Sequence, residues 1–458
     1  MTDQSTTRSP SPATHGYSLG RRNFIKTAAG AAGAGLILPA ALAACGGDDD
    51  DSGSGSDGTA APEGTAEAPA AASGDLSVGS RLANDAPKAG LAAAVEAFPN
   101  EDVNVSINTT DSNTFQENIS TYLQNPDDVI AWFAGYRMRF FAAQGLLGDI
   151  SSIWPALDSE LGSGFKTAST GDDGKQYFVP FSYYAWGIHY RKSLFEDNGW
   201  EIPTSVDELT ALAAEMEASG ITPFAFGNDG NWPAMGTFDQ LNFRINGYQF
   251  HVDLMAGKES WTSDQVREVF ATYETLLALH QENPNGRTWE EAAAALVNKE
   301  AGMMTIGNFA GSQFPEGELE DLDFFPFPEI NPEYGLDVVE APIDGWMMAA
   351  APGNEAAALE MLEYLGTAAA QDVYLSEDPS VVATSSAADT SVYNALQQKA
   401  AETVQNAEFV TQFLDRDTSP EFAANVAGPR FADFISDPSS IDGILEDMQA
   451  QSEVILTT

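Results

Sequence analysis

Residues 128–135 read DVIAWFAG, a short apolar run between an aspartate and a glycine. A continuous apolar run of this length, bounded by turn residues, is typical of a strand buried in a sheet. Similar runs recur along the chain and alternate with helical patterns, which predicts α/β lobes with largely parallel sheets. The predicted strands are 75–79, 103–107, 129–133, 177–180, 222–226, 301–306 and 346–351.

Helices are predicted between these strands. The first three cover 90–98, 115–123 and 137–147. Three later helices have a start signal in which serine or threonine precedes an acid or amide by three residues, the spacing of a capping box. These pairs are Ser205 with Glu208, Thr262 with Gln265, and Thr288 with Glu291. The helix after Ser205 is predicted to end at Gly220, because glycine commonly follows a helix C-terminus.

The N-terminus has the layout of an export signal. Arg21 and Arg22 precede a long apolar run that ends in LAAC, which resembles a lipobox whose thiol, Cys45, takes the lipid. We therefore expect a twin-arginine lipoprotein signal peptide at 1–44 and an exported protein anchored to the cell membrane through Cys45. A transmembrane anchor is the alternative, but the run contains Pro39 and no basic cluster follows it.

The composition after the signal separates a linker from a folded body. Residues 45–73 contain no large apolar side chain, so we expect a disordered, lipid-tethered linker there. About 385 residues follow, which suits two lobes rather than one core. The formal net charge of −48 argues against nucleic acid and anionic lipid as partners of the body. It favours a solvated, salt-adapted surface over a cation-binding function.

The sequence contains no recognisable catalytic signature, neither HExxH nor GxSxG nor a phosphate loop. Cys45 is the only cysteine, and His189 and His280 continue a strand and a helix pattern. We therefore expect no enzyme activity, no cofactor and no metal site. One alternative stays open, since a glycosidase-type pair of carboxylates cannot be recognised among 68 acidic residues.

Aromatic residues stand beside polar ones at strand ends and in loops. Rings stack on the C–H faces of sugars while charged and amide groups bind the hydroxyls, so this pattern predicts a carbohydrate site. The candidates are Trp132, Tyr136, Tyr184, Trp186, Trp232, Asn308, Phe309, Asp344 and Trp346. Alternatively, each tryptophan simply fills core. Of the adjacent Tyr183 and Tyr184, one should pack inward, because neighbours in an extended segment face opposite sides.

Several short segments, weak alone, are informative in their order and spacing. They are DVIAWFAG at 128–135, GLL at 145–147, GKQYFVP at 174–180, YRK at 190–192, PT at 203–204, EL at 208–209, GITP at 220–223 and AGMM at 301–304. Together they resemble the family 1 extracellular solute-binding proteins, relatives of maltose-binding protein. The resemblance covers nearly all of 75–458.

The resemblance implies a type II-like periplasmic-binding-protein fold: two α/β lobes joined by hinge strands, with the ligand in the cleft between them. Its lobes map to 74–181 with 344–389, and to 182–343 with 390–458. It implies a receptor that delivers a sugar or oligosaccharide to the transmembrane permease subunits of an ABC importer. A polyol, an amino compound or a polyamine is the alternative solute, and a cleft with more carboxylates than rings would favour a polyamine.

The resemblance also implies ligand contacts. The loop after the first strand maps to Asn84 and Asp85. Arg81 and Leu82 stand where many sugar-binding relatives carry tryptophan, which leaves the size of the ligand open. The other implied contacts are Trp132 on the first lobe, Trp232 and Phe309 on the second, Trp346 on the returning hinge strand, and Asp415 on a late loop that reaches the cleft.

Overall fold

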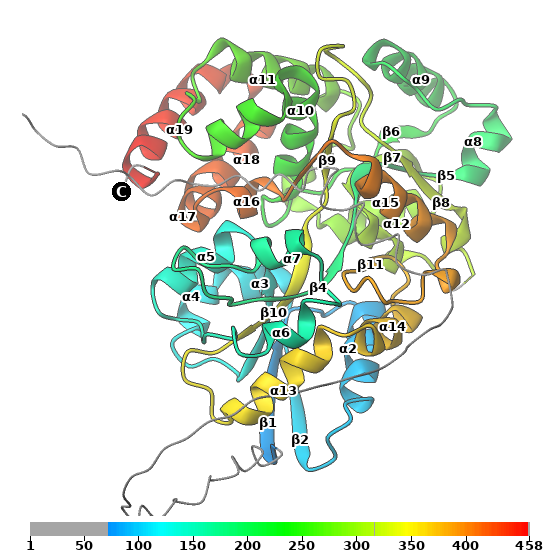
Figure 1. Ribbon diagram of the computed structural model, residues 1–458. Helices are drawn as coiled ribbons and strands as arrows, with labels where there is room; N and C mark the ends of the chain where they lie inside the picture. The colour runs from blue at the N-terminus through cyan, green and yellow to red at the C-terminus, as the bar shows by residue number, and fades with distance from the viewer. Residues whose placement is uncertain (1–71, 316, 457–458) are drawn as a thin grey trace, which may run out of the picture.

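The computed structural model describes residues 72–315 and 317–456. The predicted signal peptide, Cys45 and nearly all of the predicted linker lie outside these residues. The described chain forms two α/β lobes, one below the other in Figure 1. Each lobe has its own sheet, and a small two-stranded sheet accompanies the upper one.

The lower lobe in Figure 1 contains a six-stranded sheet of order β11-β4-β10-β3-β1-β2. Its strands are β1 (Gly74–Ser80), β2 (Val103–Thr109), β3 (Val129–Phe133), β4 (Val179–Tyr183), β10 (Ile343–Met348) and β11 (Val382–Ala383). β1 pairs in parallel with β2 and β3, but β10 is antiparallel to β3 and β4, and β11 to β4. The prediction of a largely parallel sheet is therefore wrong. β10 runs against its neighbours because the chain re-enters this lobe through it.

Helices pack around this sheet. They are α2 (Asp85–Glu96), α3 (Ser112–Glu117), α4 (Ile119–Tyr122), α5 (Tyr136–Ala143), α6 (Trp154–Leu157), α7 (Ser163–Ala168), α13 (Glu355–Leu365) and α14 (Ala368–Glu377). α13 contacts the sheet across β1, β3, β4 and β10, while α14 packs against α2. The loop between β1 and α2 and the helix α3 lie at the end of the sheet that faces the upper lobe (Figure 1).

The upper lobe contains a four-stranded sheet of order β6-β7-β5-β8. The strands are β5 (Trp186–Arg191), β6 (Thr222–Phe224), β7 (Ala301–Gly307) and β8 (Leu322–Phe325), with β9 (Val338–Glu340) and β12 (Phe409–Thr411) in the two-stranded sheet. β6 and β7 are parallel, whereas β5 is antiparallel to β7 and β8. β9 and β12 are parallel.

The upper lobe is richer in helix than the lower one. Its helices are α8 (Lys192–Asn198), α9 (Val206–Ala218), α10 (Pro233–Met255), α11 (Asp264–Leu277), α12 (Trp289–Val297), α15 (Ala395–Asn406), α16 (Leu414–Asp417), α17 (Pro420–Phe422), α18 (Gly428–Ser436) and α19 (Ile441–Ile455). The described chain also forms five short 3₁₀ helices, η1 (Pro284–Gly286), η2 (Asn308–Gln313), η3 (Leu319–Asp321), η4 (Thr390–Val392) and η6 (Pro438–Ser440). A π-helical turn, η5 (Ala423–Ala427), precedes α18. α10 packs against α11, α16 and α18, and it also contacts β7.

Three chain segments connect the lobes. Residues 184–185 lead from β4 to β5, residues 341–342 lead from β9 back to β10, and residues 384–394 lead from β11 to α15. In Figure 1, β4 and β10 lie side by side where the two lobes meet. Because few residues cross, the crossings can serve as hinges for a relative motion of the lobes.

The helix start signals were only partly correct. Ser205 and Thr288 are N-caps, and Thr288 forms the complete capping box with Glu291. The third helix, α11, instead begins after Ser263, whose hydroxyl accepts the hydrogen bond of the Val266 N–H group. Thr262 and Ser263 each carry a hydroxyl that can cap a helix, so the sequence pattern alone predicted the wrong residue as the N-cap.

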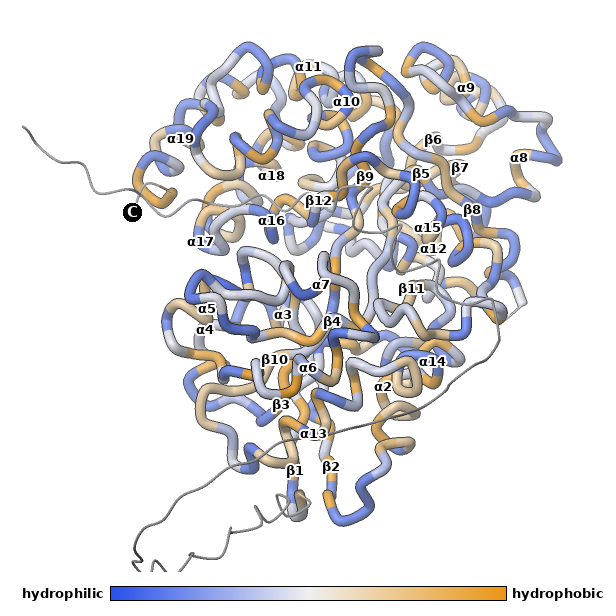
Figure 2. Tube along the Cα trace, in the orientation of Figure 1, coloured by the Kyte–Doolittle hydropathy of each residue, from blue (hydrophilic) through white to orange (hydrophobic). Residues whose placement is uncertain are grey.

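Hydrophobic residues lie along both sheets and on the inward sides of the helices, as the orange stretches in Figure 2 indicate. Across residues 72–315 and 317–456, no helix has the length and apolar character needed to cross a membrane. The same residues contain no group of three or more His, Cys, Asp or Glu side chains placed to hold a metal ion.

Candidate ligand-binding site

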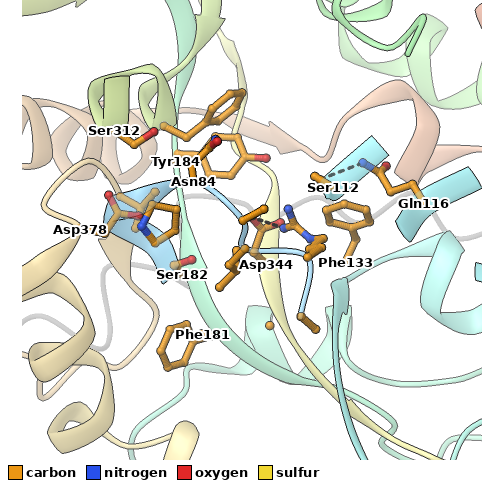
Figure 3. Close-up of a pocket in the computed structure, with 18 of the residues that line it drawn as sticks. Asn84, Ser112, Gln116, Phe133, Phe181, Ser182, Tyr184, Ser312, Asp344 and Asp378 are labelled. Carbon is orange, nitrogen blue, oxygen red and sulfur yellow. Dashed lines mark hydrogen bonds and ion pairs between the residues drawn. The ribbon is translucent and has the colours of Figure 1, made fainter. Parts of the chain in front are cut away.

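A cavity lies between the lobes and receives side chains from both. Its empty space, part of which is continuous with solvent, is about 1150 Å³. The lower lobe contributes the loop between β1 and α2, the start of α3, and the ends of β3, β4 and β10. The upper lobe contributes the starts of α10 and α12, η2 and α16. Figure 3 shows part of this lining.

The wall from the lower lobe supplies most of the polar side chains of the cavity, beside the rings of Phe133, Phe181, Trp346 and Tyr374. Figure 3 shows Asn84, Ser182, Asp344 and Asp378 around the cavity. Asn84 is the N-cap residue of α2, but its side chain makes no capping hydrogen bond. Burial raises the pKa of Asp378, which favours its neutral form. Amide, hydroxyl and carboxyl groups of this kind can donate to and accept from the hydroxyls of a ligand.

The wall from the upper lobe is aromatic. Trp186 packs edge-to-face on Trp232 at 6.3 Å between ring centroids and lies 5.1 Å from Phe413. Tyr184 packs edge-to-face on Phe309 at 5.0 Å. The indole N–H of Trp186 is buried and has no hydrogen-bond partner among the described residues.

Asp344 links the two lobes at the base of the cavity. Its carboxylate lies 2.8 Å from a guanidinium nitrogen of Arg81 and 3.0 Å from one of Arg416. Arg416 also donates to the Tyr184 hydroxyl at 2.9 Å. Burial lowers the pKa of Arg416, but Tyr184, Asp344 and Asp415 outweigh burial and raise it above its ordinary value. The Arg416 guanidinium is therefore held in its charged form beside the cavity.

A second ion pair extends this network toward α5. The Arg137 guanidinium donates to Asp415 at 2.8 Å and to the Gln116 amide oxygen at 2.9 Å. The Phe133 ring lies between the arginines, with the Arg416 guanidinium carbon 3.9 Å and the Arg137 carbon 5.2 Å from its centroid. These contacts join the lower-lobe residues Gln116, Phe133 and Arg137 to the upper-lobe helix α16.

Buried acids lie behind α16, on the side away from the cavity. Asp239 accepts a hydrogen bond from the backbone N–H of Leu414 at 2.8 Å. Glu340, His251 and Asp417 complete this cluster. Burial raises the pKa of both Asp239 and Glu340, and the charge of Asp239 raises that of Glu340 further. The neutral form is therefore favoured, which lets two acids pack behind the segment that carries Asp415 and Arg416.

The structure brings many of the predicted site residues to this cavity. They are Asn84, Tyr184, Trp186, Trp232, Phe309, Asp344, Trp346 and Asp415. Tyr183, by contrast, is buried and packs on Phe165 at 6.1 Å. Tyr184 is thus the one of the pair that faces the cavity. Direct contact of these residues with a ligand stays a prediction.

Four predicted site residues lie outside the cavity lining. Trp132 is fully buried against Phe141, because Ala131 and Phe133 point to the cavity and the residue between them points away. The other three are Asp85, Tyr136 and Asn308.

Local structure explains the placement of those three residues. Asp85 is exposed in the first turn of α2, one position after Asn84. Tyr136 starts α5 and lies 5.8 Å from the guanidinium of Arg139. Asn308 is buried at the start of η2, and its neighbour Phe309 faces the cavity in its place.

Several cavity residues carried no distinguishing signal in the sequence. Arg81, Glu290, Asp378 and Arg416 look like ordinary charges in a chain that contains 88 charged residues. Phe413 lies in a segment without a clear strand pattern. These residues become recognisable only when the fold brings them together.

Comparison with known proteins places the chain in a family. Residues 83–372 match the profile of bacterial extracellular solute-binding proteins. An uncharacterised ABC transporter extracellular-binding protein of Pyrococcus horikoshii is 25% identical over 54% of this chain and 56% of its own length. A probable sugar-binding periplasmic protein of Brucella suis is 28% identical over 39% of this chain and 43% of its own length. The chain thus spans about half the length of these curated relatives.

A solved structure matches over a longer stretch. The bacterial solute receptor AcbH, described with an exclusive preference for β-D-galactopyranose, is 41% identical with a TM-score of 0.81. The match covers 83% of this chain and 99% of that receptor. The two-lobed architecture agrees with this likeness. The chain belongs to the bacterial extracellular solute-binding protein family.

Proposed function

We propose that this chain is the extracytoplasmic receptor of an ABC importer and that it captures a sugar between its lobes. The observation that carries the proposal is a cavity between the lobes in which aromatic rings lie beside polar and charged side chains. A sugar ring has C–H groups on its faces, which the aromatic rings can stack on, and hydroxyls at its edge, which the polar side chains can bind. The galactopyranose preference described for AcbH supports the same class of ligand.

The lining argues against a polyamine, and the family match argues against hydrolysis. Ten aromatic residues but only five carboxylates line the cavity, and Asp344 and Asp415 are paired with arginines. A polyamine receptor would need carboxylates in excess over rings. The family match is to binding proteins, which supports binding rather than hydrolysis. We therefore propose binding and release without turnover.

The mechanism follows from the cross-lobe lining. A ligand that touches both walls stabilises the closed arrangement of the lobes, and it can shift the equilibrium only by its greater affinity for that arrangement. The closed, loaded receptor is the form that we propose the permease recognises. Residues 184–185, 341–342 and 384–394 are the crossings at which we expect the backbone to bend.

A sugar panel tests the proposed function. Purified full-length protein is titrated calorimetrically and melted with D-galactose, other hexoses, disaccharides, polyols, amino compounds and polyamines. We expect at least one sugar to bind, and at 100 times its Kd to stabilise the native state by about 2.7 kcal/mol. Stabilisation by a polyamine alone, with no response to any sugar, would contradict the proposal.

The proposed membrane attachment rests on the sequence, since Cys45 lies outside the described residues. The finer proposal is a lipoprotein exported by the twin-arginine route and held to the membrane at Cys45. We expect Cys45→Ala to leave an unlipidated precursor, whereas the parent is recovered in the membrane fraction. Mass spectrometry of the N-terminal peptide checks this, and lipid on the Cys45→Ala protein would disprove it.

A further inference from the structure

A second cavity lies next to the first. Its empty space is about 590 Å³, and Asn113, Gln116, Trp232 and Asp415 line both cavities. The wall that separates the two cavities is therefore only one side chain thick. Asn113 and Gln116 come from α3 in the lower lobe, while Trp232 and Asp415 come from the upper lobe. The wall exists only when the lobes face each other.

One half of the wall is a hydrogen bond between the lobes. The Trp232 indole N–H donates to the Asn113 side-chain oxygen at 3.2 Å. The loop before Trp232 is built for this approach: Gly230 has a φ of +81°, and a Cβ atom there would lie 2.9 Å from the Asn113 amide. A side chain at position 230 would displace the Asn113 amide, so glycine lets the indole meet the amide.

The other half of the wall is ionic. Gln116 and Asp415 both accept hydrogen bonds from Arg137, at 2.9 Å and 2.8 Å. The Arg137 and Asp415 side chains are only 7% and 12% exposed, so this pair is shielded from solvent. Because a shielded ion pair holds its geometry, we expect this half to be the stiffer one. The Asn113–Trp232 half depends on one neutral hydrogen bond and is the weaker closure.

The second cavity is itself suited to a sugar ring. Glu117 and Asn231 supply acceptors and a donor, while Met235, Ala423 and Ala424 supply an apolar surface. Trp232 is among the residues that line this cavity. Two sites with the same mixture of polar and apolar lining thus lie on either side of one removable barrier.

We infer that the Asn113–Trp232 pair is a specificity-determining barrier that confines the ligand to one sugar ring in the first cavity. This inference rests on the proposed sugar-binding function and adds the limit on ligand length. A disaccharide whose second ring points toward α3 must break the interlobe hydrogen bond or leave the lobes open. Removal of the barrier joins the cavities and admits the second ring.

Two variants break the barrier from opposite sides. Asn113→Ala removes the acceptor, and Trp232→Phe keeps an aromatic face but removes the N–H donor. Calorimetric titrations with D-galactose, lactose and melibiose give the ratio of disaccharide to monosaccharide Kd. We expect the parent to bind both disaccharides at least tenfold more weakly than galactose. The Asn113→Ala/Trp232→Phe double variant should lower the ratio for at least one disaccharide by tenfold or more.

A control on the same helix separates specificity from structural damage. Asn118 ends α3, is exposed, and donates its amide to the backbone oxygen of Thr114 at 2.8 Å, away from both cavities. Asn118→Ala should leave the ratio unchanged. The barrier inference is wrong, while the proposed function stands, if the parent binds galactose and both disaccharides equally. The same conclusion follows if the double variant melts like the parent and its ratio of disaccharide to monosaccharide Kd is unchanged. Failure of every sugar to bind the parent overturns the proposed function as well.

Discussion

Arg416→Met is expected to lower the free energy of unfolding by about 3 kcal/mol, the lower end of the range for removing one partner of a buried ion pair. The Arg416 guanidinium is 7% exposed and lies within 3.0 Å of Asp344. Methionine fills the volume of the arginine side chain but leaves Asp344 paired with Arg81 alone. The Tyr184 hydroxyl also loses the hydrogen bond that Arg416 donates. The loss stays at the lower end because Asp415 keeps its pair with Arg137.

Chemical denaturation of parent and variant measures this change. Arg430→Met is the matched control, because Arg430 also contacts two acids, Asp433 and Asp447, but its side chain is 37% exposed. Solvent screening should limit the effect of Arg430→Met to about 1 kcal/mol or less. Arg416→Lys should fall between the two, since it restores the charge without the planar fork. Equal stability of Arg416→Met and Arg430→Met would show that the network does not hold the lobes.

The fold was predictable where a segment has one simple period. The run at 129–133 is the strand β3, with the same bounds, because five consecutive apolar residues bounded by turn residues are typical of a strand buried on both faces. α10 was missed for the opposite reason. Nearly every residue from Pro233 to Ile245 is buried, so the helix has no polar side and no amphipathic pattern.

The site was less predictable than the fold because its chemistry is assembled from distant segments. Asp344 meets Arg81 and Arg416 only after the chain has crossed between the lobes three times. Aromatic residues at strand ends and in loops gave a usable signal, as Trp186 and Trp232 show. Within β3 the same signal selected Trp132, because composition does not tell which side of a strand faces the cavity.

The two tryptophans Trp346 and Trp232 were both expected to stack on a sugar, but the structure gives them different surroundings. Trp346 is 1% exposed, lies in the middle of β10, and packs edge-to-face on Phe181 at 5.8 Å. It reaches the cavity with only part of its surface. Trp232 is half-buried in the loop before α10 and contacts other rings of the aromatic wall.

Trp346→Ala is therefore expected to lower the free energy of unfolding by about 3–5 kcal/mol, as for a large ring removed from a packed core. Trp232→Ala should cost much less stability but weaken galactose binding tenfold to a hundredfold, because it removes a stacking surface of about 1.5–3 kcal/mol. Thermal melts and titration calorimetry on both variants, with Trp346→Phe as a control that keeps a ring in the core, distinguish the roles. If Trp346→Ala melts like the parent and loses binding, or if Trp232→Ala binds galactose unchanged, the corresponding assignment is wrong. The two variants differ because β10 is held between β3 and β4 on both sides, so a cavity left by Trp346 cannot collapse, whereas the loop at Trp232 can adjust.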